Sequence, residues 1–175
     1  WLGTYEGPMI RKDLLDAAGL PVPETIEEWD AAMYAFIDLV EIPFGTWGGT
    51  VFNDVLTNAY GFTMNYYLDG ETVKYGYAEP GYLEFLTLLN RWYADGIIDP
   101  DFATNDRPGL QTKVLSSLVG ATRTSGSTLS GYLTQMAALG VTDEWVATQY
   151  PSLNKGDSRK FIQGETYSIG AQAVI

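Results

Sequence analysis

The stretch GPMIRKDLLDAAGLPVPETIEEW, residues 7–29, carries the local signals that decide the predicted fold. Its first part is a short apolar run at 7–10, which predicts a strand. Residues 13–18 then predict a short helix, and Gly19 follows as its stop, because glycine accepts the left-handed conformation found at helix ends. A strand followed directly by a helix is typical of an α/β domain.

The second part of the stretch predicts a connector and a longer helix. Pro21 and Pro23 fix their own backbones and turn the preceding residues away from helix, so this segment is expected to be extended. Thr25 with Glu28 three residues later has the spacing of a capping box. Apolar residues then recur every three or four positions, which predicts an amphipathic helix over 26–40.

The rest of the chain continues the alternation of helices and strands. Helices are predicted at 51–60, 79–94, 108–118 and 126–139, strands at 119–124, 145–150 and 166–175, a loop at 43–49, and a hairpin at 66–77 turning at Asp69 and Gly70. In the helix at 79–94, the spacing lets Leu83, Leu86, Leu89 and Tyr93 share a face. Trp29 and Trp92 fall in helical apolar patterns, which favours core packing over ligand contact.

Composition limits the chemistry available to the chain. Its 175 residues, 46% of them hydrophobic, are enough for one sizeable core without disulfides or a structural metal. The absence of Cys and His from the sequence excludes a thiolate nucleophile, a Ser-His-Asp triad and the usual zinc or haem ligands. Catalysis would have to use carboxylates, Lys, Tyr or a cation bound by oxygen.

The charge balance also limits the possible partners. With 22 acidic and 10 basic side chains, the net charge is −12, and the basic residues are scattered. This argues against nucleic acid and against anionic lipid, since both need a concentrated positive surface. The longest apolar runs fall short of the roughly 20 residues that span a bilayer. Since the chain starts at Trp1 without a signal peptide, we expect it to be a piece of a longer protein.

Two segments together resemble the extracellular solute-binding proteins of bacterial ABC importers, in the carbohydrate-binding, lipoprotein-type branch. The first is the stretch at 7–29, and the second is WYADGIIDPDF, residues 92–102, which is similar to that family's helix end and following turn. Three later segments agree more loosely with the family, and they are 119–126, 150–156 and 167–170. Their order and spacing make the resemblance more specific than any one of them.

The resemblance implies a type II periplasmic-binding-protein fold, in which two α/β lobes enclose a ligand. Residues 1–175 are then expected to be a single helix-rich α/β lobe with a small mixed sheet, the second and C-terminal one. The implied function is capture of a carbohydrate, an oligosaccharide, by hinge closure between lobes rather than catalysis, with no cofactor or metal. The implied partners are ABC permease subunits, and the implied state is a monomer, extracellular or periplasmic, anchored through a lipidated N-terminus.

Aromatic residues in loops are candidates for the sugar contact. Flat rings flanked by short polar side chains suit the apolar faces and hydroxyl rims of sugars. Trp47, between glycines at 45 and 48, is the first candidate, although it could equally pack under its own loop. Tyr66 and Tyr67 alternate between the two faces of a strand, so one of them should point outward, and Asn65 beside them is a polar candidate.

The turn at 122–127 supplies the other polar candidates. It lies between a predicted strand and a predicted helix, where free backbone N–H groups and the helix dipole favour hydroxyls or an anion. Arg123 could donate paired hydrogen bonds to sugar hydroxyls, with Thr124 and Ser125 beside it. The alternative is that Ser125 or Ser127 only caps the helix and that Arg123 pairs with a surface acid.

Asp99, Asp101 and Asp106 allow more than one interpretation. An EF-hand calcium loop would need a central Gly and a Glu at position twelve, and both are missing. A glycosidase would need two carboxylates across a cleft. Turn chemistry is the favoured reading. A carbohydrate-active enzyme or its sugar-binding module remains the alternative function, and an adhesion or structural domain without a small ligand is a third possibility.

Overall fold

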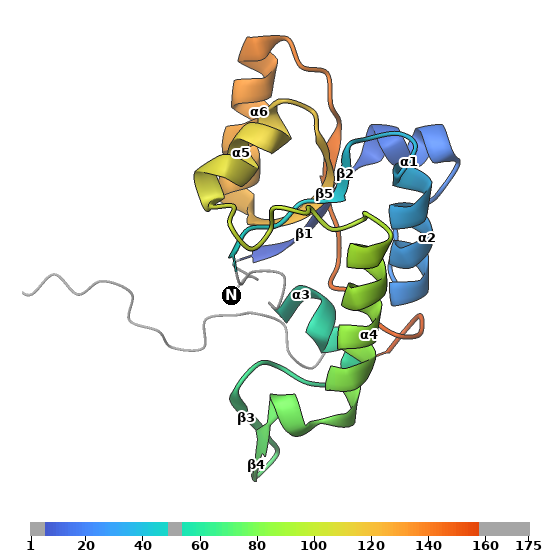
Figure 1. The fold of residues 1–175 in the computed structure, drawn as a ribbon, viewed down its shortest axis with the longest axis vertical. Coiled ribbons are helices and arrows are strands. Elements are labelled where there is room, and N and C mark those ends of the chain that lie inside the picture. Colours follow the sequence, from blue (N-terminus) through green and yellow to red (C-terminus); the bar gives the residue numbers. More distant parts are fainter. Residues whose placement is uncertain (1–5, 49–53, 158–175) are drawn as a thin grey trace, which may run out of the picture.

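The computed structural model describes residues 6–48 and 54–157, which form a helix-rich α/β fold (Figure 1). Four strands form one sheet, namely β1 (Glu6–Arg11), β2 (Ile42–Phe44), β5 (Val119–Ser125) and β6 (Trp145–Ala147). Two more, β3 (Tyr66–Asp69) and β4 (Thr72–Tyr75), form a hairpin. The helices are α1 (Lys12–Ala18), α2 (Ile26–Phe36), α3 (Asp54–Thr57), α4 (Pro80–Ala94), α5 (Arg107–Leu115) and α6 (Gly126–Leu139), with 3₁₀ turns η2 (Asn58–Tyr60) and η3 (Gly76–Ala78).

The four-stranded sheet is mixed and has the order β2-β5-β1-β6. Strand β1 is antiparallel to both of its neighbours, whereas β2 and β5 are parallel, with Ile42 opposite Val119 and Phe44 opposite Ala121. The predicted helix-rich α/β architecture with a small mixed sheet is therefore confirmed.

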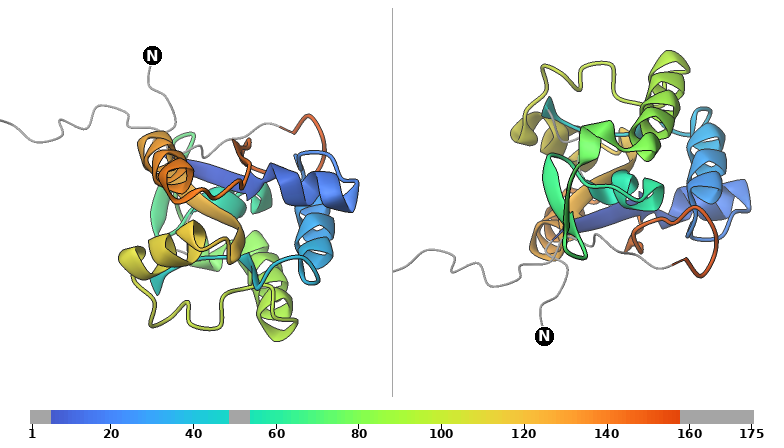
Figure 2. Two further views of the ribbon diagram at one scale, coloured as in Figure 1. Left: turned by 90° about the horizontal axis from the view of Figure 1, so that it is seen from above. Right: turned by 90° about the horizontal axis from the view of Figure 1, so that it is seen from below.

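Helices cover the sheet on two sides, and each side has its own hydrophobic cluster. The larger, which we call the α2–α4 cluster, contains Ile10, Trp29, Phe36 and Trp92, all fully buried. The smaller, the α5–α6 cluster, contains Met9, Val114, Val119 and Met136. The adjacent residues Met9 and Ile10 enter different clusters because successive side chains of a strand point to opposite faces. Figure 2 shows α5 and α6 on one side of the molecule and α1 and α2 on the other.

Local signals in the opening stretch fold as the sequence predicts. Gly19 ends α1 in the left-handed conformation, with φ of 68°. Thr25 Oγ1 accepts a hydrogen bond from the Glu28 amide at 3.2 Å, and Glu28 Oε2 accepts one from the Thr25 amide at 3.2 Å. The capping box is thus confirmed. Trp29 and Trp92 are both core residues, as predicted.

The predicted helix at 26–40 is too long, because α2 ends at Phe36. The chain must leave the helix there for Ile42 to reach the sheet, where its amide donates to the Leu118 carbonyl at 2.9 Å. The predicted loop at 43–49 is also corrected, since its first two residues belong to β2. Pro43 is tolerated in β2 because this strand lies at the edge of the sheet.

In helix α4 only part of the predicted face is buried. Leu89 is buried and Leu86 packs against the α2–α4 cluster, but Leu83 and Tyr93 are 72% and 50% exposed. Phe85, Leu88 and Trp92 are the other buried residues of this helix. Apolar residues occur on two neighbouring stripes of this helix, so packing rather than periodicity selects which stripe is buried.

Several predicted boundaries also differ from the structure. Helix α5 ends at Leu115 instead of 118, β6 ends at Ala147 instead of 150, and the hairpin turns one residue later, at Gly70 and Glu71. The described part of the predicted helix at 51–60 is the short helix α3 followed by η2. The predicted strand at 166–175 lies outside the described residues. Within 6–48 and 54–157, none of the helices has the length and apolar character needed to cross a membrane.

Candidate functional site

Four of the predicted site residues lie at one edge of the sheet. Strands β2 and β5 are parallel, so both end at that edge, and the Gly45 amide donates to the Ala121 carbonyl at 2.8 Å just beyond β2. Trp47 follows two residues later, and β5 ends with Arg123, Thr124 and Ser125. In open α/β sheets, ligands bind beyond the carboxyl ends of strands. We call these four residues the sheet-edge site.

Trp47 is partly buried at this edge and packs against the α5–α6 cluster. Part of the indole is therefore used for packing, as in the alternative interpretation, and part faces solvent. A ring held in this way is a fixed surface, because packing removes most of its rotational freedom before any ligand arrives.

Ser125 is the N-cap of α6 and is 4% exposed. Its Oγ accepts a hydrogen bond from the Thr128 amide at 3.2 Å and lies 3.0 Å from Ser127 Oγ and 2.9 Å from Thr128 Oγ1. The Arg107 guanidinium donates to Thr128 Oγ1 at 3.0 Å. The capping role proposed as the alternative is present, and it places a row of hydroxyls at the positive end of the helix dipole.

Arg123 forms an ion pair with Glu6 across the β1–β5 pair, and both side chains are mostly buried. Thr124 lies beside it, opposite Gly7, and is partly buried. The pairing with an acid, which was the alternative interpretation, is present as well. Because Glu6 neutralises its guanidinium, Arg123 adds no net positive charge to the edge, and the hydroxyls and the indole there suit a neutral ligand.

The remaining three predicted residues lie on the hairpin, away from the sheet edge. Figure 1 shows β3 and β4 at the end of the molecule opposite α5 and α6. Asn65 has a φ of 64°, a conformation that asparagine tolerates, and its carbonyl accepts from the Gly76 amide at 2.7 Å. Tyr66 is 74% exposed, whereas Tyr67 is partly buried against the α2–α4 cluster, so burial raises the pKa of its phenol.

Tyr66 is the outer end of a chain of aromatic contacts that begins in the core. Ring centroids are 4.8 Å apart for Tyr66 and Tyr75, 5.2 Å for Tyr75 and Tyr77, 5.2 Å for Tyr77 and Tyr82, and 5.7 Å for Tyr82 and Phe62. The sequence analysis missed Tyr75, although the hairpin pattern contains the signal. A turn between Asp69 and Thr72 places position 75 directly opposite 66.

The three aspartates of the 99–106 segment have structural contacts. Asp99 is fully buried and its carboxylate accepts from Lys113 Nζ at 2.9 and 2.8 Å and from the Asp101 amide at 3.0 Å. Asp106 caps α5 by accepting from the Gly109 amide at 2.8 Å. Burial works against the charge of Lys113, but its hydrogen bonds to Asp99 prevail and raise its pKa. In the described part of the chain, no group of three acidic side chains is placed to hold a metal ion.

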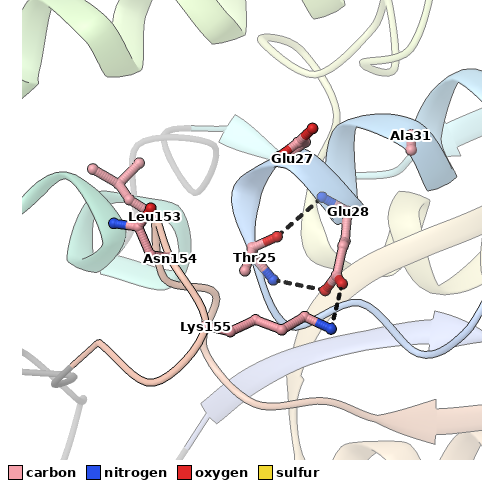
Figure 3. Close-up of a pocket in the computed structure, with 7 residues that line it drawn as sticks. All are labelled: Thr25, Glu27, Glu28, Ala31, Leu153, Asn154 and Lys155. Carbon is pink, nitrogen blue, oxygen red and sulfur yellow. Dashed lines mark hydrogen bonds and ion pairs between the residues drawn. The ribbon is translucent and has the colours of Figure 1, made fainter.

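Two adjoining cavities lie on another face, between α2, α4 and residues 152–155. One, of about 460 Å³, is lined by Thr25, Glu27, Glu28, Ala31, Leu153, Asn154 and Lys155 (Figure 3). The other, of about 530 Å³, is lined by Ile26, Glu27, Asp30, Tyr60, Glu84, Thr87, Leu88, Arg91 and Leu153. They share Glu27 and Leu153, and we call the two together the α2–α4 groove.

Comparison with known proteins finds the same architecture among solved structures. No protein-family profile and no curated protein matches the sequence. Among solved structures, alginate-binding protein AlgQ2 has a TM-score of 0.76 at 22% identity, over 87% of this chain and 34% of its own. An HMO-binding, ABC-transporter-associated solute-binding protein from Bifidobacterium longum infantis has a TM-score of 0.72 at 22% identity, over 90% and 36%. The chain has the fold of part of a solute-binding protein.

A third structure agrees with this assignment of the fold. Sugar transporter BL01359 from Bacillus licheniformis, in complex with stachyose, has a TM-score of 0.66 at 16% identity, over 89% of this chain and 42% of its own. The chain thus spans between 34% and 42% of the length of these three proteins. The predicted resemblance to ABC-importer solute-binding proteins is confirmed at the level of the fold.

The α2–α4 groove was not found by the sequence analysis of this solute-binding fold. The helix dipole favours acidic residues in the first turn of a helix, and the capping box explains Glu28, so the sequence gives no reason to single out Glu27. In the structure Glu28 is hydrogen-bonded to the Thr25 amide and paired with Lys155 at 2.7 Å, whereas Figure 3 shows Glu27 without a bond to any residue drawn.

Proposed function

We propose that this chain is one lobe, the C-terminal one, of the carbohydrate-binding component of an ABC importer. The supporting observation is the shared fold, because three of the solved structures that share it are named as alginate-binding, as HMO-binding and as a sugar transporter in complex with stachyose. In this proposal the sheet-edge site contacts an oligosaccharide, with Trp47 as the apolar surface and Arg123, Thr124 and Ser125 as polar partners. Capture occurs by closure of two lobes and involves no catalytic step.

The hairpin is the second part of the proposed binding surface. Tyr66 is exposed and supported by Tyr75 at 4.8 Å, and Asn65 and Tyr67 flank it. Two aromatic surfaces separated on one lobe suit a ligand longer than a single sugar ring. The parent protein is proposed to be a monomer outside the cytoplasmic membrane, held by a lipidated N-terminus and delivering its ligand to permease subunits.

The function is tested on the full-length, two-lobed parent protein with a panel of neutral oligosaccharides, acidic oligosaccharides, amino acids and peptides. We expect an oligosaccharide to raise the melting temperature, because a ligand that binds only the folded state stabilises it by mass action. If only amino acids or peptides raise it, the proposed substrate class is wrong.

The site is tested with aromatic substitutions in the same parent. Trp47→Ala and Tyr66→Ala should each weaken binding of the active oligosaccharide about tenfold, as expected when a buried aromatic contact is lost. Tyr93→Ala is the matched control, since Tyr93 is a half-exposed aromatic residue of α4 that belongs to neither proposed surface. Unchanged affinity for both Trp47→Ala and Tyr66→Ala would place the ligand elsewhere.

A further inference from the structure

A separate surface, the α2–α4 groove, has features of a protein-docking site. Its walls come from α2 and α4, which are joined where the Asp30 carboxylate accepts from the Arg91 guanidinium and from Trp92 Nε1, both at 2.7 Å. Residues 152–155 close one end, where Ser152 bonds the Glu24 carbonyl. The groove is thus held by side-chain contacts between elements that are distant in the sequence.

The groove carries uncompensated negative charge. Four carboxylates line the two cavities together with two cations, and both cations are already engaged, Arg91 with Asp30 and Lys155 with Glu28. Glu27 on α2 and Glu84 on α4 remain, and within 6–48 and 54–157 their side chains have no hydrogen bond or ion pair. Burial and the negative charge of Glu84 together raise the pKa of the Tyr60 phenol to about 12.

Apolar atoms form the floor between these carboxylates. Ile26 and Leu88 are 8% and 6% exposed, Tyr60 is partly buried, and Leu153 projects with 45% of its surface exposed. A hydrated metal ion would leave such a floor uncovered. An arginine or lysine side chain fits it better, because its methylene stem covers apolar surface while its head pairs with a carboxylate.

We propose that the α2–α4 groove docks a basic segment of a partner protein, in which arginines alternate with apolar residues. A guanidinium would pair with Glu27 and another with Glu84, and the apolar residues would pack on Leu88 and Leu153. A second copy of this chain is a poor occupant, since each copy carries a net charge of −12 and the two would repel. The proposal concerns a different face from the sheet-edge site and does not depend on sugar binding.

The test uses three labelled hexapeptides, LRLRLR, SRSRSR and LELELE, added to the 175-residue chain and followed by fluorescence anisotropy. We expect LRLRLR to bind more tightly than SRSRSR, and LELELE not to bind. The double variant Glu27→Gln with Glu84→Gln should weaken LRLRLR binding about tenfold, from the loss of two charge pairs. Leu153→Ser should weaken LRLRLR but leave SRSRSR unchanged.

A matched double variant separates docking from general attraction to an acidic protein. Glu71→Gln with Glu144→Gln removes the same charge from two exposed positions outside the groove, and LRLRLR affinity should stay within about twofold. Equal weakening by both double variants would overturn the proposal, as would equal binding of LRLRLR and SRSRSR or no binding of either. If the first double variant does not fold, Glu84→Lys alone, at an exposed position, should weaken LRLRLR binding by a comparable factor.

Discussion

At the scale of single residues, Gly120 in β5 has little space for a side chain. A Cβ atom there would lie 2.6 Å from Phe36 Cδ2 and 3.0 Å from the Pro43 carbonyl oxygen. Gly120→Ala should therefore lower the free energy of unfolding by about 1–3 kcal/mol, the usual cost of overpacking a core. Chemical denaturation followed by circular dichroism measures this change.

Gly131→Ala is the control for that substitution. Gly131 lies inside α6, and, apart from its chain neighbours and the backbone of its own helix, no heavy atom of the described residues is within 4 Å of the position its Cβ would take. Alanine should raise stability there by about 0.5–1 kcal/mol, because it is the better helix former. Equal effects of the two substitutions would contradict the close contact at Gly120.

The ion pair of Lys113 with Asp99 is a second residue-scale feature. Asp99 is completely buried, so Lys113→Met would leave its carboxylate without its charged partner and should cost about 3–5 kcal/mol. Lys12→Met removes an exposed pair with Asp16 and should cost less than about 1 kcal/mol. Urea denaturation of both variants checks this order, and a small effect at Lys113 would show that the buried carboxylate is satisfied by other donors.

At the scale of elements, the start of α2 should make stability depend on acid pH. The hydrogen bond from Lys155 lowers the pKa of Glu28, helped by the amides of Glu24 and Thr25 and opposed by partial burial. A carboxylate with a lowered pKa stabilises the fold above its ordinary pKa of 4.5, and this contribution is lost as pH falls below that value.

Glu28→Gln tests this contribution while keeping an acceptor for the capping box. The stability difference between wild type and variant should be largest near neutral pH and should shrink below pH 4.5 as Glu28 is protonated. Urea unfolding between pH 7 and pH 3 measures the difference. A difference that stays constant with pH would mean that the charge of Glu28 does not stabilise α2.

At the scale of the whole molecule, the four-stranded sheet lies between the two hydrophobic clusters and contributes side chains to both. Met9 and Ile10 are neighbours in β1 but pack in different clusters. Loss of packing in either cluster therefore disturbs β1, and through it the other cluster. Met136→Ala, in the α5–α6 cluster, should therefore lower the stability of the entire fold, by about 2–5 kcal/mol. Transitions followed by far-UV circular dichroism and by tryptophan fluorescence should coincide, and separate transitions would show independent clusters.

The sequence predicts those elements whose signals are local. Gly19, the Thr25–Glu28 capping box and the start of α6 at Gly126 all act through neighbouring residues, and the structure places them as expected. The predictions are wrong where contacts with residues distant in the sequence outweigh the local pattern. The Ile42 amide bonds to the Leu118 carbonyl beside β5, so the chain leaves α2 earlier than its periodicity predicts. In α4, packing against distant residues buries Phe85 and leaves Leu83 exposed.

For the candidate site too, some features were predicted from the sequence and others depend on the tertiary structure. The sequence by itself predicted Trp47 as a loop residue, Arg123, Thr124 and Ser125 as residues of a turn between a strand and a helix, and the hairpin tyrosines as alternating side chains. Only the tertiary structure decided that β2 and β5 end at one edge, that Glu6 neutralises Arg123, and that Glu27 and Glu84 line one groove. Local conformation follows from interactions within a few residues, whereas a binding surface depends on which distant segments pack together, and a single sequence does not specify that packing directly.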